Sequence, residues 1–198
     1  MDTREQILQT ALRQFSRRGY HAVSIRDICG EVGIKESSLY YHFTNKRALL
    51  EALLERFAQK AAHFTRLLDE GTAQPAGMDD AAFLQVGEGY VQGYLLDPEI
   101  LCFFGMLRIE RENDPALAAL YREWYFERPL QFQTSMFERL AQAGYFPAGQ
   151  AQRLALLYLA PILFFYEREL PLDGEDARAR LLQAVRRHLE DFLKEHRK

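Results

Sequence analysis

The sequence predicts an all-α protein in which an N-terminal three-helix domain precedes a larger helical domain. Apolar residues recur at helical spacing, no segment alternates steadily between apolar and polar residues, and Gly or Pro stands where the periodic segments stop. The 198 residues, 48% of them hydrophobic, can build the core of one domain or of a small domain joined to a medium one. We expect about nine helices.

The first two helices are marked by their capping residues. Thr3, with Gln6 three residues later, predicts the start of the first helix, and Gly19 predicts its end. Ser24 and Asp27 repeat the capping-box pattern at the start of a second, short helix. This helix has too little surface to bury alone, so it has to pack against the first.

Gly33 ends the second helix, and a third short helix is expected over about residues 36–42. Two short helices around a glycine turn, packed on a longer helix, form a unit of the helix-turn-helix type. Six further helices are expected. The first runs from a cap at Asn45 to about Asp69, the second ends at Asp97-Pro98, and the third begins at Pro98. The fourth begins at Pro115 and has a kink at Pro129, and the last two cover about residues 147–168 and 175–196. Residues 70–78 are expected to be a turn-rich connection.

Charge is divided unevenly along the chain. A formal net charge of −3 argues against a protein that coats nucleic acid through bulk charge. Residues 1–50, however, hold eight basic and five acidic side chains, whereas residues 51–198 hold 17 basic and 23 acidic ones. A basic beginning and an acidic remainder indicate two functions on one chain.

The third predicted helix leaves a polar and aromatic face exposed when Leu39 and Phe43 pack inward. Hydroxyl and basic side chains suit the base edges and phosphates of DNA, and a short helix can enter a groove with its first turn and one face. The segment from Ser24 to Lys46 also resembles the N-terminal signature of the TetR family of transcriptional regulators. The glycine turn, Leu39, Tyr40, Phe43, Asn45 and Lys46 have the spacing of that family.

The resemblance implies a helix-turn-helix DNA-binding domain over residues 1–46 and a helical ligand-binding and dimerisation domain over residues 47–198. It implies a cytoplasmic repressor that binds a double-stranded, palindromic operator as a homodimer and is released by a small-molecule effector. By position in the motif, the DNA contacts would be made by Ser24, Arg26, Lys35, Ser37, Ser38, Tyr40, Tyr41, His42 and Lys46.

Several of these residues also have a purely structural interpretation. Ser24 is a good N-cap, and an exposed arginine such as Arg26 is ordinarily solvated. The ring of Tyr40 can pack against the three-helix unit. His42 fits a phosphate contact or an ordinary surface position equally well. A cation at a helix N-terminus opposes the helix dipole, so the structural interpretation explains Lys46 poorly and a phosphate contact explains it better.

Two residues depart from the family pattern. Cys29 replaces the usual alanine of the second helix, and a small apolar thiol is expected to pack there. Lys35 stands where a Ser or Thr commonly caps the third helix, which weakens the cap and leaves Ser37 or Ser38 free for DNA.

The C-terminal part offers two apolar surfaces. The 13-residue run Leu154–Tyr166 is apolar all round, so it has to be buried on every side, partly by its own domain and partly by a partner subunit. The last helix adds a stripe through Leu181, Leu182, Val185, Leu189, Phe192 and Leu193. Together they resemble the helices of a four-helix dimer interface. The alternative is a central core helix in a monomer.

An effector site is expected between the middle helices, and its ligand should be largely apolar or aromatic. The candidate lining residues are Phe83, Tyr90, Tyr94, Phe103, Phe104, Met106, Tyr121, Trp124, Tyr125, Phe165 and Tyr166. Aromatic residues at helical spacing are more often core than ligand wall. The charged residues beside these stretches, Arg108, Glu110 and Glu167, are expected at the surface.

Other classes of protein find little support in the sequence. It has no signal-peptide pattern and no apolar run long enough to span a membrane. Catalytic and nucleotide-binding motifs are absent, the five histidines are scattered, and no cofactor or metal site is expected. Cys29 and Cys102 are expected to be reduced core thiols. The main alternative function is a DNA-binding architectural or nucleoid-associated protein of the same fold without an effector.

Overall fold

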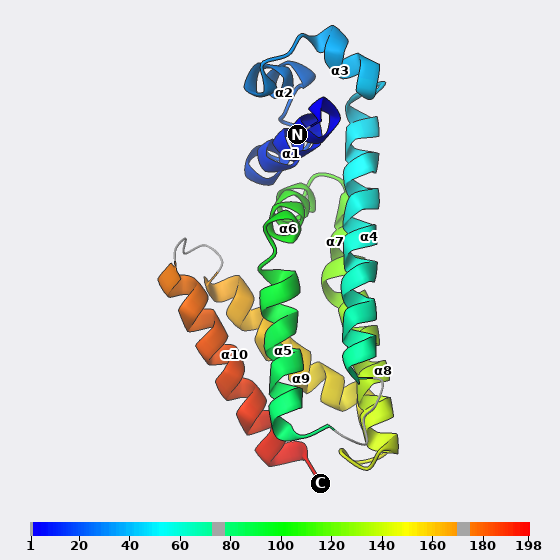
Figure 1. Cartoon of the computed structure of the whole chain (residues 1–198), viewed down its shortest axis with the longest axis vertical. Coiled ribbons are helices and arrows are strands. Elements are labelled where there is room, and N and C mark those ends of the chain that lie inside the picture. The colour runs from blue at the N-terminus through cyan, green and yellow to red at the C-terminus, as the bar shows by residue number, and fades with distance from the viewer. Residues whose placement is uncertain (1, 73–77, 170–174) are drawn as a thin grey trace. The chain divides into compact units, whose positions relative to one another are not determined.

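The computed structural model describes residues 2–72, 78–169 and 175–198. Within these ranges the chain forms α-helices and two π-helical turns and contains no strand, which confirms the all-α prediction (Figure 1). The elements are α1 (Thr3–Arg18), α2 (Ile25–Val32), α3 (Glu36–His42), α4 (Lys46–Thr72), α5 (Asp80–Tyr90), η2 (Val91–Leu95), α6 (Pro98–Glu110), α7 (Pro115–Arg122), η3 (Glu123–Glu127), α8 (Arg128–Gln142), α9 (Ala151–Glu169) and α10 (Glu175–His196). We count η2 as part of α5, and we count α7, η3 and α8 as one helix. Counted in this way, the described ranges hold the nine helices expected.

The chain forms two compact units. Unit 1 comprises residues 1–62 and 97–125, and unit 2 comprises residues 63–96 and 126–198. Unit 1 therefore contains the predicted helix-turn-helix segment together with α6 and α7, while unit 2 contains α5, α8, α9 and α10. The division into a DNA-binding domain over residues 1–46 and a ligand-binding and dimerisation domain over residues 47–198 concerns function, and it remains a prediction.

Unit 1 is built around α1. This helix buries the stripe that includes Ile7, Ala11 and Phe15, and it packs against α2, α3 and α6. Farther along α4, the ring of Phe57 stacks on Phe103 with centroids 3.7 Å apart. These contacts give the helix-turn-helix segment a core that extends into α6.

Unit 2 has an aromatic core to which several helices contribute. α9 packs against α8 and α10, and α10 also packs against α5. Phe83 of α5 lies in ring contact with Phe137, Phe146, Tyr158 and Phe192. Burial of rings of this size supplies much of the apolar stabilisation of such a unit.

Three details of the predicted elements were wrong. The N-cap of α1 is Asp2, whose carbonyl accepts from the Gln6 amide at 3.0 Å, so Thr3 already lies inside the helix. α9 begins at Ala151 rather than near 147, because the preceding turn contains Gly149 with φ of 76°. The departure from α geometry near Pro129 takes the form of η3, which precedes the proline.

The connection expected over residues 70–78 begins later than predicted, since α4 continues to Thr72, and residues 73–77 lie outside the described ranges. None of the described helices combines the length and hydrophobicity needed to cross a membrane. The described residues also contain no cluster of three or more His, Cys, Asp or Glu side chains arranged to hold a metal ion.

Candidate DNA-binding surface

The start of α2 is fixed by a complete capping box, as predicted. The Ser24 hydroxyl accepts from the Asp27 amide at 3.1 Å, and the Ser24 amide donates to the Asp27 carboxylate at 2.8 Å. The same hydroxyl donates to that carboxylate at 2.7 Å. These bonds, with Arg18 nearby, lower the pKa of Asp27. Ser24 is therefore engaged as a cap, and a phosphate contact by it remains a prediction.

The turn between α2 and α3 depends on Gly33. Its φ of 77° lies in the left-handed region that glycine favours, and its amide donates to the Cys29 carbonyl at 2.9 Å. After the turn, Leu39 and Phe43 are buried and anchor α3 to the unit. The inward positions of α3 follow the predicted pattern.

The outer face of α3 holds polar side chains that the fold does not use. Its N-cap Lys35 makes no side-chain capping bond, which agrees with the expected weak cap. Ser37 and Ser38 are exposed, and within the described ranges their hydroxyls have no hydrogen-bond partner. Tyr41 is 86% exposed, an unusual position for a large aromatic residue. Hydroxyls and an exposed ring on one short helix can bind base edges and phosphates.

Part of this face borders an open groove of about 450 Å³. The groove is lined by Thr3, Ile34, Ser37, Ser38, Tyr41 and His42. Four of the predicted DNA-contact residues thus come together in one place. Thr3 and Ile34 were not predicted for this surface, and only the folded chain brings Thr3 beside α3.

The other predicted contact residues lie outside this groove. Arg26 is exposed on α2 and Lys35 is exposed before α3. Tyr40 is 48% exposed, so part of the residue packs against the unit and part is open to solvent. Their contacts with DNA remain predictions.

Lys46 has internal partners that the sequence did not indicate. Its Nζ donates to the carbonyls of Tyr20 and Val23, each at 3.0 Å, and lies 4.5 Å from the centre of the Tyr20 ring. Partial burial lowers its pKa. Lys46 therefore fastens the α1–α2 turn to the start of α4, where Asn45 caps the helix as predicted by accepting from the Ala48 amide at 2.8 Å.

The same turn is held from the other side by Glu110, at the end of α6. Glu110 was expected at the surface but is only 2% exposed. Its carboxylate accepts from the His21 amide at 2.9 Å and contacts His21 Nδ1 at 2.6 Å. The His21 Nε2 lies 3.8 Å from the carboxylate of Asp114. The expectation for Glu110 was wrong because its partner is distant in sequence.

The predicted effector residues are distributed over both units. Unit 1 contains Phe103, Phe104, Met106, Tyr121, Trp124 and Tyr125, and unit 2 contains Phe83, Tyr90, Tyr94, Phe165 and Tyr166. Phe83 belongs to the packed aromatic core of unit 2. Tyr90 and Tyr94 form a separate stack, with centroids 5.8 Å apart and Phe64 beside Tyr94.

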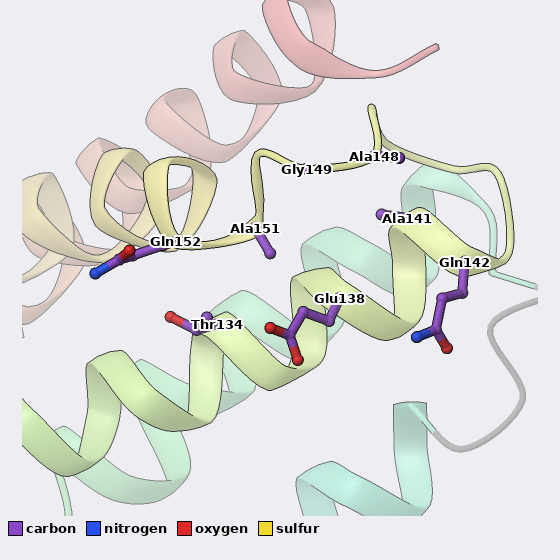
Figure 2. A pocket seen from close by; sticks show the side chains of 8 residues that line it. All are labelled: Thr134, Glu138, Ala141, Gln142, Ala148, Gly149, Ala151 and Gln152. Carbon is purple, nitrogen blue, oxygen red and sulfur yellow. The ribbon is translucent and has the colours of Figure 1, made fainter.

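Unit 2 also carries a surface groove of about 430 Å³ that the sequence did not predict. Figure 2 shows Thr134, Glu138 and Gln142 on α8 and Ala151 and Gln152 at the start of α9. Small and polar side chains line it, and none of the effector candidates does. It is therefore a poor match to the expected apolar ligand.

The run Leu154–Tyr166 is not buried on every side within the protomer. Leu156 is 54% exposed and Phe164 is 61% exposed, whereas Tyr158, Ile162 and Tyr166 are buried. The described helix thus has an inner face packed in unit 2 and an apolar outer face.

Comparisons with known proteins agree with this geometry. Residues 7–53 match the family model for bacterial regulatory proteins of the tetR family. The HTH-type transcriptional regulator TtgR of Pseudomonas putida is 34% identical over 86 residues, which cover 43% of this chain and 41% of TtgR. The chain thus matches less than half the length of this curated relative.

Two solved structures share the fold over nearly the whole chain. One is a protein described as a TetR-family transcriptional regulator from Mesorhizobium loti MAFF303099, with a TM-score of 0.73, 21% identity, and coverage of 99% of this chain and 97% of that chain. The other is a protein described as a transcriptional regulator from Saccharomonospora viridis, in complex with choline, with a TM-score of 0.66, 25% identity, and coverage of 98% and 97%. Residues 7–53 therefore match the N-terminal segment of the tetR family of bacterial regulatory proteins, and the described residues share their helical fold with the two solved structures.

Proposed function

We propose that this protein is a one-component transcriptional repressor that binds a palindromic operator as a homodimer and is released by a largely apolar small molecule. The observation that carries the proposal is the outer face of α3, where Ser37, Ser38 and Tyr41 are exposed beside a groove and are not used by the fold. As the second helix of the helix-turn-helix unit, α3 would enter the major groove, with Thr3 and His42 toward the backbone.

The apolar outer face of α9 supports the homodimer. Leu156, Ala160 and Phe164 are exposed at intervals of four residues, so they share one side of the helix. Apolar side chains concentrated on one exposed helix face are typical of a subunit interface. A two-fold dimer would place its two α3 helices at half-sites about one helical turn of DNA apart.

The effector is supported by the aromatic content of the interior and by the S. viridis relative, which binds choline in its crystal structure. A ligand shifts such a protein only by preferring the conformation that does not bind DNA. We propose that the protein acts in the cytoplasm, where its operator lies.

The central test is a gel shift with DNA from upstream of the protein's own reading frame, followed by a reporter assay for the direction of regulation. We expect a sequence-selective complex with a shallow salt dependence, since few basic residues face DNA. Absence of a selective shift would refute the proposal, and a salt slope near ten would mean that many more phosphates are bound. A complex that no apolar compound dissociates would favour the architectural alternative.

The homodimer is tested by Phe164→Glu, which places a charge in the proposed interface. Multi-angle light scattering should show a monomer, and operator binding should be lost because both half-sites are no longer bound together. Phe126→Glu is the matched control, since Phe126 is another exposed phenylalanine and lies on η3 rather than on α9. A variant Phe164→Glu that stays dimeric would exclude this interface.

A further inference from the structure

Tyr41, on the outer face of α3, is more exposed than any other large hydrophobic residue in the described part of the chain. It is 86% exposed, whereas Phe164, the next in order, is 61% exposed. Its ring lies edge-to-face with that of its neighbour His42, and the two ring centroids are 5.2 Å apart. The Tyr41 ring therefore contributes little to the core and is available to whatever binds α3.

A second apolar side chain lies in the same groove. Ile34, which follows Gly33 in the turn, lines the groove together with Tyr41. The turn fixes its position, because the Ile34 amide donates to the Cys29 carbonyl at 3.0 Å, beside the bond from the Gly33 amide. Ile34 is half-buried, so part of its surface is open to the groove. The groove thus has an apolar component that phosphate binding does not need.

The groove lacks the side chains that commonly identify purines. Bidentate hydrogen bonds from Arg or Lys select guanine, and those from Asn or Gln select adenine. The six described residues that line the groove include none of these four types. Lys35 and Glu36 can bind guanine and cytosine, but neither of them lines the groove.

The polar groups that remain in the groove distinguish the base pairs poorly. The hydroxyls of Ser37 and Ser38 can donate or accept, so they can bind the edge of any base. His42 is half-buried, and its ring is in contact with that of Tyr41. The apolar surface of Tyr41 and Ile34 does discriminate, because thymine alone among the four bases presents a methyl group in the major groove.

We propose that this groove reads A·T base pairs, whose thymine methyl groups pack on the Tyr41 ring and on Ile34 while Ser37 and Ser38 bind neighbouring base edges. The inference rests on the proposed operator binding and names the base that this surface selects. Tyr41 becomes a specificity-determining residue, and its exposure in the free protein leaves the ring open to a methyl group in the major groove.

The first experiment replaces thymine by uracil, which forms the same base pair and lacks only the C5 methyl group. Half-sites are selected from randomised duplexes by binding to the protein, and each thymine is then replaced singly by deoxyuridine. Fluorescence anisotropy should show an affinity lowered about fourfold at each position that meets the groove, the loss expected for one buried methyl group. Replacements in the flanking DNA should leave the affinity unchanged.

The second experiment asks whether Tyr41 is responsible for this preference. Tyr41→Ala should bind the thymine and uracil operators equally, whereas Tyr41→Phe, which keeps the ring, should retain the preference. Ser37→Ala is the matched control on the same helix, since it should weaken binding to both operators by the same factor. Thermal melting of each variant checks its fold, and the wild-type comparison of thymine with uracil tests the proposal without any variant.

The outcomes separate this proposal from the operator function. A sequence-selective complex that is indifferent to every uracil replacement overturns the thymine contact and leaves the repressor function standing. A uracil effect of the same size in Tyr41→Ala shows that another residue reads the methyl group, and it also overturns the proposal, as do selected half-sites that share no A·T pair. If no duplex is bound selectively, the operator function itself fails.

Discussion

The two short helices of the DNA-binding segment use their N-terminal polar groups in opposite ways. At the start of α2, Ser24 and Asp27 satisfy each other in a capping box. At the start of α3, Lys35 provides no cap, and Ser37 and Ser38 remain exposed. Because the free N–H groups of a helix start are ordinarily capped, the uncapped helix is the exception. The difference separates residues that maintain the fold from residues that are available to DNA.

The largest effect expected from this comparison is on α3. The double variant Ser37→Ala/Tyr41→Ala should weaken operator binding about 100-fold, since each lost groove contact is worth about 1–3 kcal/mol. Its unfolding midpoint should stay close to that of the wild type, because neither side chain has a partner in the core. Fluorescence anisotropy and chemical denaturation measure the two quantities. A loss of stability without a loss of affinity would reverse the roles assigned to α2 and α3.

A second prediction concerns the turn that leads into α2. Glu110→Gln should destabilise the protein by about 1.5–3 kcal/mol, because a buried carboxylate that accepts from the His21 amide loses its charge-assisted bonds. Glu112→Gln, at an exposed neighbouring position, should have little effect. Urea denaturation of both variants provides the comparison. Equal stabilities would mean that α6 does not hold this turn.

A smaller effect is expected at the cap of α2. Ser24→Ala should lower the free energy of unfolding by about 1 kcal/mol, a common cost of losing an N-cap, whereas Ser37→Ala should leave it unchanged. The two substitutions are chemically identical and lie at the starts of adjacent helices. If both cost the same, the contrast between the helices is not one of capping.

The smallest effect is a dependence on pH. The pKa of Asp27 is lowered chiefly by hydrogen bonds from Ser24, so the capping box stabilises the protein fully above the ordinary aspartate pKa. That contribution is lost as the pH falls through the lowered value, where the folded protein takes up a proton. The stability difference between wild type and Ser24→Ala should therefore shrink in acid. A difference that is constant with pH would show that Asp27 does not take part.

The features of the fold that could be predicted are those that depend on residues close to one another in the sequence. The capping box, the Gly33 turn and the buried Leu39 each depend on neighbours within a few residues, and the sequence indicated all three. The helix pattern was predictable for the same reason. The N-cap of α1 was misplaced by one residue because Asp2 and Thr3 are both good capping types and adjacent.

The candidate site was less predictable where its contacts are long-range. Glu110 and His21 are 89 positions apart, and no local pattern links them. The position of Lys46 was predicted, but its bonds to the carbonyls of the α1–α2 turn depend on tertiary packing. Thr3 carried no signal, because an ordinary helix position becomes part of a groove only after folding.

Gly19 occupies a position where two independent constraints coincide. Its φ is 86°, and a Cβ there would lie 2.6 Å from the Glu110 carboxylate and 2.9 Å from the Ile109 side chain. A mutational scan of the chain should therefore record Gly19 as intolerant of every substitution, although it is not among the residues proposed to contact DNA or an effector. Shortening residue 110 in the same gene would relieve part of the crowding but not the backbone conformation, so such a second-site suppressor should rescue a Gly19→Ala strain only in part. The rescue would be reduced further by loss of the hydrogen bond that the Glu110 carboxylate accepts from the His21 amide.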